Sequence, residues 1–165
     1  MMVTERSIPS GHGVTIRAAT FQDWPIIVQF NTLLAEETEQ KRLHPETIAA
    51  GVQTLLLNPQ HGRYFVACLE SQVVGQIMHT REWSDWRNGE IWWLQSVYVL
   101  SEFRRRGVFR ELLAYMETSA RSSAIVVGIR LYVELHNARA QDAYLRLGFK
   151  QADYRVMQQL FGNET

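Results

Sequence analysis

The spacing of apolar residues divides the first half of the chain into strands and helices. Thr20 is a suitable N-cap for one helix, and Pro45 fits the first turn of another, where a missing N–H costs nothing. Alternation of apolar and polar side chains indicates strands before and after these helices. In order, the patterns predict a strand over 14–18, a helix over 21–38, a helix from Pro45 to the breaker segment 58–62, and a hairpin of strands over 63–70 and 73–80.

The second half of the chain changes twice from strand to helix. Residues 91–99 are apolar and aromatic, with β-branched Val97 and Val99, which is typical of a strand buried on both faces. Helical spacing then places a row of apolar side chains on one side of residues 108–120. The remaining predictions are a polar, aromatic loop over 81–89, a strand over 129–134, a helix from Asn137 to Leu147 that Gly148 ends, and one or two strands over 149–160.

This order of elements predicts an α+β fold. Antiparallel hairpins combine with a crossover around the helix at 108–120, so we expect a mixed, twisted sheet with helices on both faces. The expected sheet has roughly six to seven strands and is flanked by about four helices. Residues 1–12 are expected to be a flexible leader, and residues 13–165 a single domain, because no repeat or low-complexity segment divides them.

Composition narrows the class of protein. The 165 residues carry 17 basic and 17 acidic side chains, so the formal net charge is 0 and gives no general affinity for nucleic acid or for an anionic membrane. Cys68 is the single cysteine, expected as a core thiol, and it fits a reducing compartment. No apolar run approaches the roughly 20 residues of a membrane span, and no signal peptide is recognisable. We therefore expect a cytoplasmic protein.

Basic charge is concentrated in one loop, Arg104-Arg105-Arg106-Gly107, between the apolar strand and the long helix. The first N–H groups of a helix lack intrahelical acceptors and carry partial positive charge. A glycine there allows close approach of a phosphate, and arginines add charged donors. The loop therefore predicts an anion site, with a solvated basic turn as the alternative.

Three motifs in this order resemble the GNAT superfamily of acetyl-CoA-dependent N-acetyltransferases. The loop Arg104–Phe109 is similar to the family's phosphate loop, and Val97–Val99 stands where the family places the strand that pairs with the pantetheine arm. The third match joins Asn137, Ala140, Tyr144 and the pair Gly148-Phe149. The resemblance covers roughly 14–155 and implies a single-domain GNAT-like fold. Phe109 departs from the pattern, because the family usually has glycine or alanine there.

The resemblance implies acetyl-CoA as the acetyl donor. Backbone N–H groups of Val97 and Val99 are expected to hold its pantetheine and acetyl ends, and the loop its pyrophosphate. Tyr144 is the expected general acid for the CoA sulfur, and Asn137 contributes as a helix cap and as a cofactor contact. The full expected cofactor set is Val97, Tyr98, Val99, Arg104, Arg105, Arg106, Gly107, Val108, Phe109, Arg110, Asn137 and Tyr144.

The general base and the acceptor site are less determined by the sequence. Glu82 and Glu134 are the principal candidate bases, with Glu90 and His79 also considered and a water relay as the alternative. Trp83 and Trp86 either cap the end of the sheet or line a pocket, where they can stack on a cationic amine. The expected substrate-binding residues are Glu36, Glu39, Trp83, Trp86 and Gln95.

The expected reaction is direct attack of a primary amine on acetyl-CoA within a ternary complex. The acceptor is expected to be a small amine, polyamine or amino-acid-like compound, although Gln95-Ser96 replaces the acidic pair that polyamine acetyltransferases tend to carry, so a polyamine is not assigned. The alternatives are a non-catalytic acyl-CoA-binding or sensor module, and acetylation of a protein N-terminus. No nucleic acid, membrane or metal is expected, since the histidines lack ligand spacing. A homodimer is left open.

Overall fold

The computed structural model describes residues 8–9 and 13–161. The chain divides into two compact parts, with the boundary between Arg130 and Leu131. The first part is built on a six-stranded sheet whose strands follow one another in chain order. Neighbouring strands from the first to the fifth are antiparallel. The strands are β1 (Ile8–Pro9), β2 (Val14–Ala18), β3 (Gly62–Leu69), β4 (Gln72–Ser84), β5 (Gly89–Val99) and β6 (Val126–Leu131).

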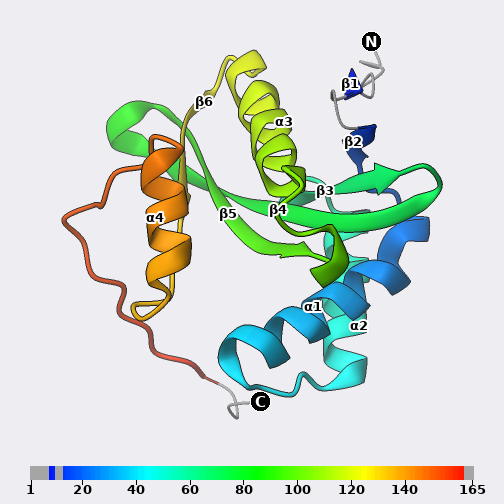
Figure 1. Ribbon diagram of the computed structural model, residues 1–165. Coiled ribbons are helices and arrows are strands. Elements are labelled where there is room, and N and C mark those ends of the chain that lie inside the picture. Colours follow the sequence, from blue (N-terminus) through cyan, green and yellow to red (C-terminus); the bar gives the residue numbers. More distant parts are fainter. Residues whose placement is uncertain (1–7, 10–12, 162–165) are drawn as a thin grey trace. The chain divides into compact units, whose positions relative to one another are not determined.

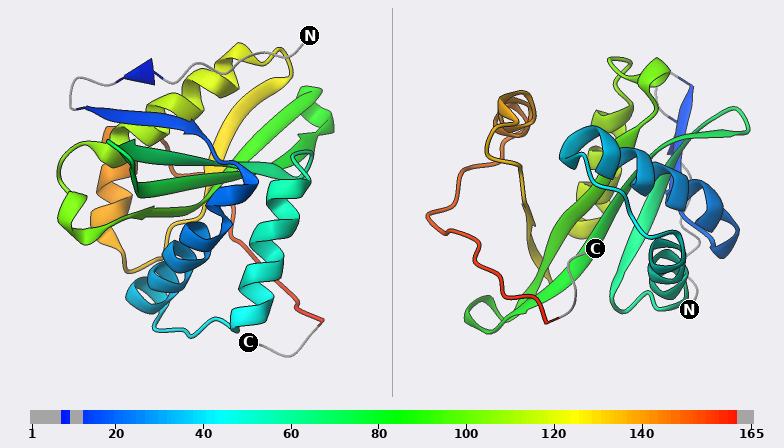
Figure 2. Two further views of the ribbon diagram at one scale, coloured as in Figure 1. Left: turned by 90° about the vertical axis from the view of Figure 1, so that its right-hand side faces the viewer. Right: turned by 90° about the horizontal axis from the view of Figure 1, so that it is seen from below.

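Helices cover both faces of this sheet, as the element order predicts. Helices α1 (Trp24–Glu39) and α2 (Pro45–Leu57) lie side by side on one face, and α3 (Val108–Ser122) lies on the other (Figures 1 and 2). Short 3-10 turns over Phe21–Asp23, Asp85–Arg87 and Ser101–Phe103 connect the elements. The predicted α+β class is therefore confirmed, with a strand count at the lower end of the prediction.

Local hydrogen bonds determine where α1 begins. The Asp23 carboxylate accepts the Thr20 backbone N–H at 2.7 Å and the Thr20 hydroxyl at 3.1 Å, in a capping box on the 3-10 turn over Phe21–Asp23 that leads into α1. Arg17 in β2 donates to both oxygens of the same carboxylate at 2.8 Å. Partial burial raises the pKa of Asp23, but these hydrogen bonds and the charge of Arg17 hold it below its ordinary value. The ion pair between Arg17 and Asp23 thus joins β2 to the start of α1.

Each face of the sheet has its own apolar core. On the α1–α2 face, Ile27 and Val52 from the helices pack with Tyr64 and Met78 from the strands. On the other face, Phe65 meets Tyr115 of α3 edge to face, with ring centroids 5.3 Å apart. Consecutive side chains on a strand point to opposite faces of the sheet, so the neighbours Tyr64 and Phe65 belong to different cores.

The prediction of a loop over residues 81–89 is wrong. Strand β4 continues to Ser84 and pairs with the start of β5, with Arg81 opposite Trp92 and Trp83 opposite Glu90. The reversal is confined to the turn over Asp85–Arg87 and to Asn88, whose φ is 48°. Mixed charged and aromatic residues are typical of a strand with one exposed face, but without a run of apolar residues such a strand resembles a polar loop in sequence.

The second part contains α4 (Ala138–Arg146), and two further predictions for this end of the chain are wrong. Strand β6 ends at Leu131, so residues 132–134 are not in a strand. Residues 149–160 form no strand, because alternation alone does not create one without a neighbour to share hydrogen bonds. The leader predicted over 1–12 lies outside the described residues, except for β1. Among the described residues, no helix is long and apolar enough to cross a membrane.

His79 is fully buried between aromatic rings. Its ring is nearly parallel to that of Trp92, with centroids 3.7 Å apart, and lies 5.9 Å from that of Phe65. Burial lowers the pKa of His79 to about 3, and its side chain is 0% exposed. It therefore packs as a neutral core residue on β4, and this excludes it as the proton acceptor that the sequence allowed.

We expect His79 to make the protein less stable in acid. Its pKa is lower in the folded than in the unfolded chain, so its contribution is complete above pH 6.5 and is lost as the pH falls from 6.5 towards 3. The loss from this group is about 1.4 kcal/mol per pH unit. Urea unfolding across this range should show a smaller slope in His79→Phe than in the wild type. His61→Gln, at an exposed histidine, is the control, and an unchanged slope in His79→Phe contradicts the prediction.

Candidate functional site

The basic loop ends at the start of α3 in the geometry expected for an anion site. Gly107 is the N-cap residue, has a φ of 81° and leaves the cap without a side-chain acceptor. The N–H of Glu111 donates to the carbonyl of Gly107 at 3.0 Å and closes the first turn of the helix. Phe109 lies within the helix and is half-buried, so the bulky residue at this position leaves the first turn of α3 helical. The start of the helix therefore lies next to the arginines of the loop.

A cleft of about 410 Å³ adjoins this loop. Its walls combine apolar side chains from β2, β3 and α3 with the two arginines Arg105 and Arg106. Its volume lies in the range of about 300–1,000 Å³ that is usual for ligand sites. Cations beside an apolar floor suit a ligand that carries phosphates on an apolar body.

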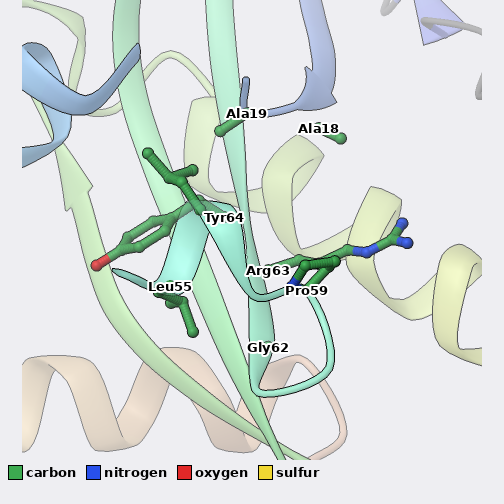
Figure 3. A pocket seen from close by; sticks show the side chains of 8 residues that line it. Ala18, Ala19, Leu55, Pro59, Gly62, Arg63 and Tyr64 are labelled. Carbon is green, nitrogen blue, oxygen red and sulfur yellow. The ribbon is translucent and has the colours of Figure 1, made fainter. Parts of the chain in front are cut away.

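A second cleft, of about 170 Å³, lies where β2, β3 and the end of α2 meet. In Figure 3, the ring of Tyr64 and the side chain of Arg63 extend in opposite directions from β3, as expected for consecutive strand residues. This volume is below the usual lower limit of about 300 Å³ for small-molecule sites. We therefore place the candidate site at the loop and not here.

The strand that leads to the loop is interrupted by a β-bulge. Gln76 pairs with Tyr98 and Met78 with Gln95, so one residue of β4 faces two residues of β5, Ser96 and Val97. Ser96 has a φ of 47°, in the left-handed region that serine rarely adopts. A bulge bends its strand, and this one changes the direction of β5 just before Val97–Val99.

A buried chain of polar side chains supports the bulge from the α1 side. The amide nitrogen of Gln76 donates to the carbonyl of Ser96 at 3.2 Å and to the side-chain oxygen of Asn31 at 2.8 Å. Asn31 in turn donates to the hydroxyl of Tyr64 at 3.0 Å. Gln76 and Asn31 are 0% and 6% exposed, so water does not substitute for these bonds. The chain joins α1, β3, β4 and β5.

Glu37, Tyr98 and Arg104 form a second link between α1 and β5. The Glu37 carboxylate accepts the Tyr98 hydroxyl at 2.7 Å and an Arg104 guanidinium N–H at 2.6 Å. Arg104 also donates through Nε to the carbonyl of Val99 at 2.8 Å. Partial burial raises the pKa of Glu37, but the two hydrogen bonds outweigh it and hold this pKa below its ordinary value. Burial and the bond to Glu37 raise the pKa of Tyr98 to about 12.

The candidate base Glu82 lies on β4, and its carboxylate already accepts two hydrogen bonds. Its carboxylate accepts the indole N–H of Trp93 and, at 3.0 Å, a guanidinium N–H of Arg130. The same guanidinium lies 5.8 Å from the centre of the Trp93 ring. Glu82 thus holds a tryptophan and an arginine in place on the sheet.

The expected acceptor residues do not gather at one point of the first part. Gln95 donates to the Thr80 hydroxyl at 2.9 Å on the same sheet. Trp83 and Trp86 are 57% and 86% exposed on the β4–β5 hairpin, and neither lines the two clefts described above. The remaining two, Glu36 and Glu39, are exposed near the end of α1.

The second part carries the expected catalytic tyrosine and one candidate base. Asn137 accepts the Ala140 N–H at 3.0 Å, so its predicted role as a helix cap is confirmed. Tyr144 packs edge to face against Phe149 at 5.6 Å, and burial raises the pKa of its phenol. The Glu134 carboxylate accepts the His136 N–H at 2.8 Å. No group of three or more potential metal ligands occurs among the described residues.

Four residues that hydrogen-bond in this region were not predicted from the sequence: Asn31, Gln76, Trp93 and Arg130. Asn31 had a usable signal, because it follows Ile27 by four positions and so occupies the apolar face of α1. Gln76 likewise stands in the apolar part of its strand. A polar residue at a core position indicates a buried hydrogen bond, although the sequence does not name the partner.

Comparisons with known proteins agree with this fold. Residues 26–149 match the profile of the acetyltransferase (GNAT) family. An N-alpha-acetyltransferase of Saccharolobus solfataricus is 28% identical over 151 residues, which cover 86% of this chain and 83% of the relative. A crystal structure described as a possible acetyltransferase from Clostridium difficile 630 is 41% identical, with a TM-score of 0.86 over 91% of this chain and 99% of that one.

A more distant structure shares the fold alone. An aminoglycoside acetyltransferase from an uncultured soil metagenomic sample, solved in complex with sisomicin, is 18% identical. Its TM-score is 0.72 over 92% of this chain and 97% of its own.

We predict that Asn31→Leu destabilises the protein by about 1–3 kcal/mol, because it removes an acceptor from Gln76 and a donor from Tyr64 inside the core. Urea unfolding measures the change in the free energy of unfolding. Thr38→Ala, at an exposed position of the same helix, serves as the control. Equal stability of Asn31→Leu and the wild type contradicts the importance given to the buried chain.

Proposed function

Because this chain belongs to the acetyltransferase (GNAT) family, as its three motifs predicted, we propose that it transfers the acetyl group of acetyl-CoA to a primary amine of a small molecule. The observation that carries the proposal is the start of α3, where Gly107 caps the helix without a side-chain acceptor and Arg105 and Arg106 line a cleft. Helix N–H groups with adjacent guanidinium groups suit a pyrophosphate.

Acetyl-CoA supplies a thioester, and the amine forms an amide bond to the acetyl carbon while the carbon–sulfur bond breaks. The reaction therefore requires two proton transfers. The amine nitrogen loses one, and the CoA thiolate gains one. We assign the gain to Tyr144, which stands in the motif that ends at Gly148-Phe149, because a phenol is protonated near neutral pH and can donate to the thiolate.

Of the two principal carboxylates, Glu134 is the preferred proton acceptor, directly or through water. Glu82 already accepts hydrogen bonds from Trp93 and Arg130, so we give it a positioning role. Val97 and Val99 follow the bulge and are the proposed backbone partners of the pantetheine arm.

A protein N-terminus is the second candidate acceptor. The relative from Saccharolobus solfataricus is an N-alpha-acetyltransferase, and it matches this chain over 86% of its length. An α-amino group differs from a small amine in the peptide attached to it. A non-catalytic acyl-CoA-binding module is the third reading, and it differs from the first two in showing binding without turnover.

Calorimetric titration with acetyl-CoA tests the cofactor site. We expect the double variant Arg106→Glu, Gly107→Asp to weaken binding by about 10²-fold, because it places two negative charges where the pyrophosphate would lie. Arg121→Glu makes the same charge change as the first substitution at the opposite end of α3 and should bind as the wild type does. A folded wild-type protein that does not bind acetyl-CoA contradicts the proposal.

A thiol-release assay with small amines and with short peptides that have a free N-terminus then identifies the acceptor. Tyr144→Phe should lower kcat by about 10²-fold or more, while acetyl-CoA still binds, because only the proton donor is removed. Unchanged kcat in this variant rules out Tyr144 as the acid. Binding of acetyl-CoA without turnover of any amine favours the non-catalytic module.

A further inference from the structure

We propose that Glu37 is a positioning residue for the acetyl-CoA site, an inference that rests on the proposed function. Its carboxylate holds Arg104 against the end of β5, and this fixes the loop that presents Gly107 and the first turn of α3. The charge of Glu37 thereby raises the affinity for a ligand that it does not touch.

The three arginines of the loop are not equivalent. The guanidinium of Arg104, whose side chain is 40% exposed, lies along the surface at the end of β5, where it donates to Glu37 and to the carbonyl of Val99 and lies 5.3 Å from the centre of the Tyr98 ring. Arg105 and Arg106 instead line the cleft beside the loop. Arg104 therefore anchors the loop, and the other two are left to meet a phosphate.

The loop needs an anchor because its backbone is strained. Arg105 has a φ of 65° and Gly107 a φ of 81°, so two of three consecutive residues adopt left-handed conformations. Glycine adopts this region readily but arginine only rarely, and such residues persist where surrounding contacts impose them. Arg104 immediately precedes the strained residue, so the position of its side chain determines where the strained turn begins.

The other end of the link is on α1. Glu37 lies in the last turn of α1, whose C-cap residue Gln40 has a φ of 54°. Phe30 of the same helix is fully buried and packs on the Tyr98 ring, with centroids 5.3 Å apart. Two residues of α1 therefore contact Tyr98, Phe30 through its ring and Glu37 through the hydroxyl, which orients the Glu37 carboxylate.

The link thus joins α1 to the phosphate loop. The same helix carries Asn31, which supports the bulge of β5 through Gln76. A shift of α1 consequently reaches both the strand and the loop of the proposed acetyl-CoA site. Substitution of Glu37 is therefore expected to raise the KM for acetyl-CoA and to leave kcat unchanged, because the reacting groups are not altered.

Glu37→Gln tests this inference. Glutamine keeps an oxygen for the Tyr98 hydroxyl but loses the charge that pairs with Arg104. We expect the Kd and KM for acetyl-CoA to rise by about threefold to tenfold. Glu46→Gln, an identical change at an exposed position of α2, should leave both values unchanged. Tyr98→Phe, which keeps the ring and removes only the hydroxyl, should raise Kd in the same direction.

A double-mutant cycle separates positioning from a general loss of stability. If Glu37 acts through Arg104, Glu37→Gln combined with Arg104→Gln should bind acetyl-CoA no more weakly than Arg104→Gln alone. Effects that multiply in the double variant, or a Kd in Glu37→Gln equal to that of the wild type, overturn the inference. In both cases the proposed function stands if the wild type binds acetyl-CoA. Failure of the wild type to bind overturns both.

Discussion

The hydrogen bond between the Gln76 amide and the carbonyl of Ser96 is the constraint on which the proposed site depends. A bulge leaves one residue outside the regular ladder, and in the interior its carbonyl needs another donor. Gln76 supplies that donor from the adjacent strand while Asn31 holds the amide in place. Without this chain, the partly buried carbonyl of Ser96 would lose the donor that Gln76 supplies, at a residue with a left-handed φ of 47°.

The bend at the bulge sets the direction of the end of β5, and so it sets the position of the basic loop that follows this strand. After Ser96, the strand continues for three residues to Val99, and the turn over Ser101–Phe103 then leads to the basic loop. The N–H of Leu100 bonds to the carbonyl of Val74 at 3.0 Å, so β4 also guides the exit of β5. A Cβ on Gly75 would lie 3.0 Å from the Tyr98 carbonyl and 3.4 Å from a Val108 methyl group, so a glycine there allows the strands to approach the start of α3.

Much of the fold could be predicted from the sequence, because the helices carry their own signals. Apolar periodicity, Thr20, Pro45 and Gly107 are local features, and the structure places helix boundaries within a few residues of them. The strand over 81–84 was harder to predict, because its charged and exposed side chains give a sequence pattern that resembles a polar loop. Residues 149–160 show the reverse error, because their alternation resembles a strand but no strand pairs with it among the described residues.

The candidate site divides in the same way. The basic loop was predictable, because an anion site needs arginines, a glycine and a helix start within a few residues. The hydrogen-bonded pairs that support the loop and the bulge could not be predicted. Gln76 and Asn31 are 45 residues apart in sequence, and Glu37 and Arg104 are 67 apart. Only folding brings such partners together. Sequence motifs therefore indicate which groups could touch a ligand, whereas the hydrogen bonds of the folded chain show that Arg104, although it belongs to the motif, is bonded to Glu37 and to the carbonyl of Val99.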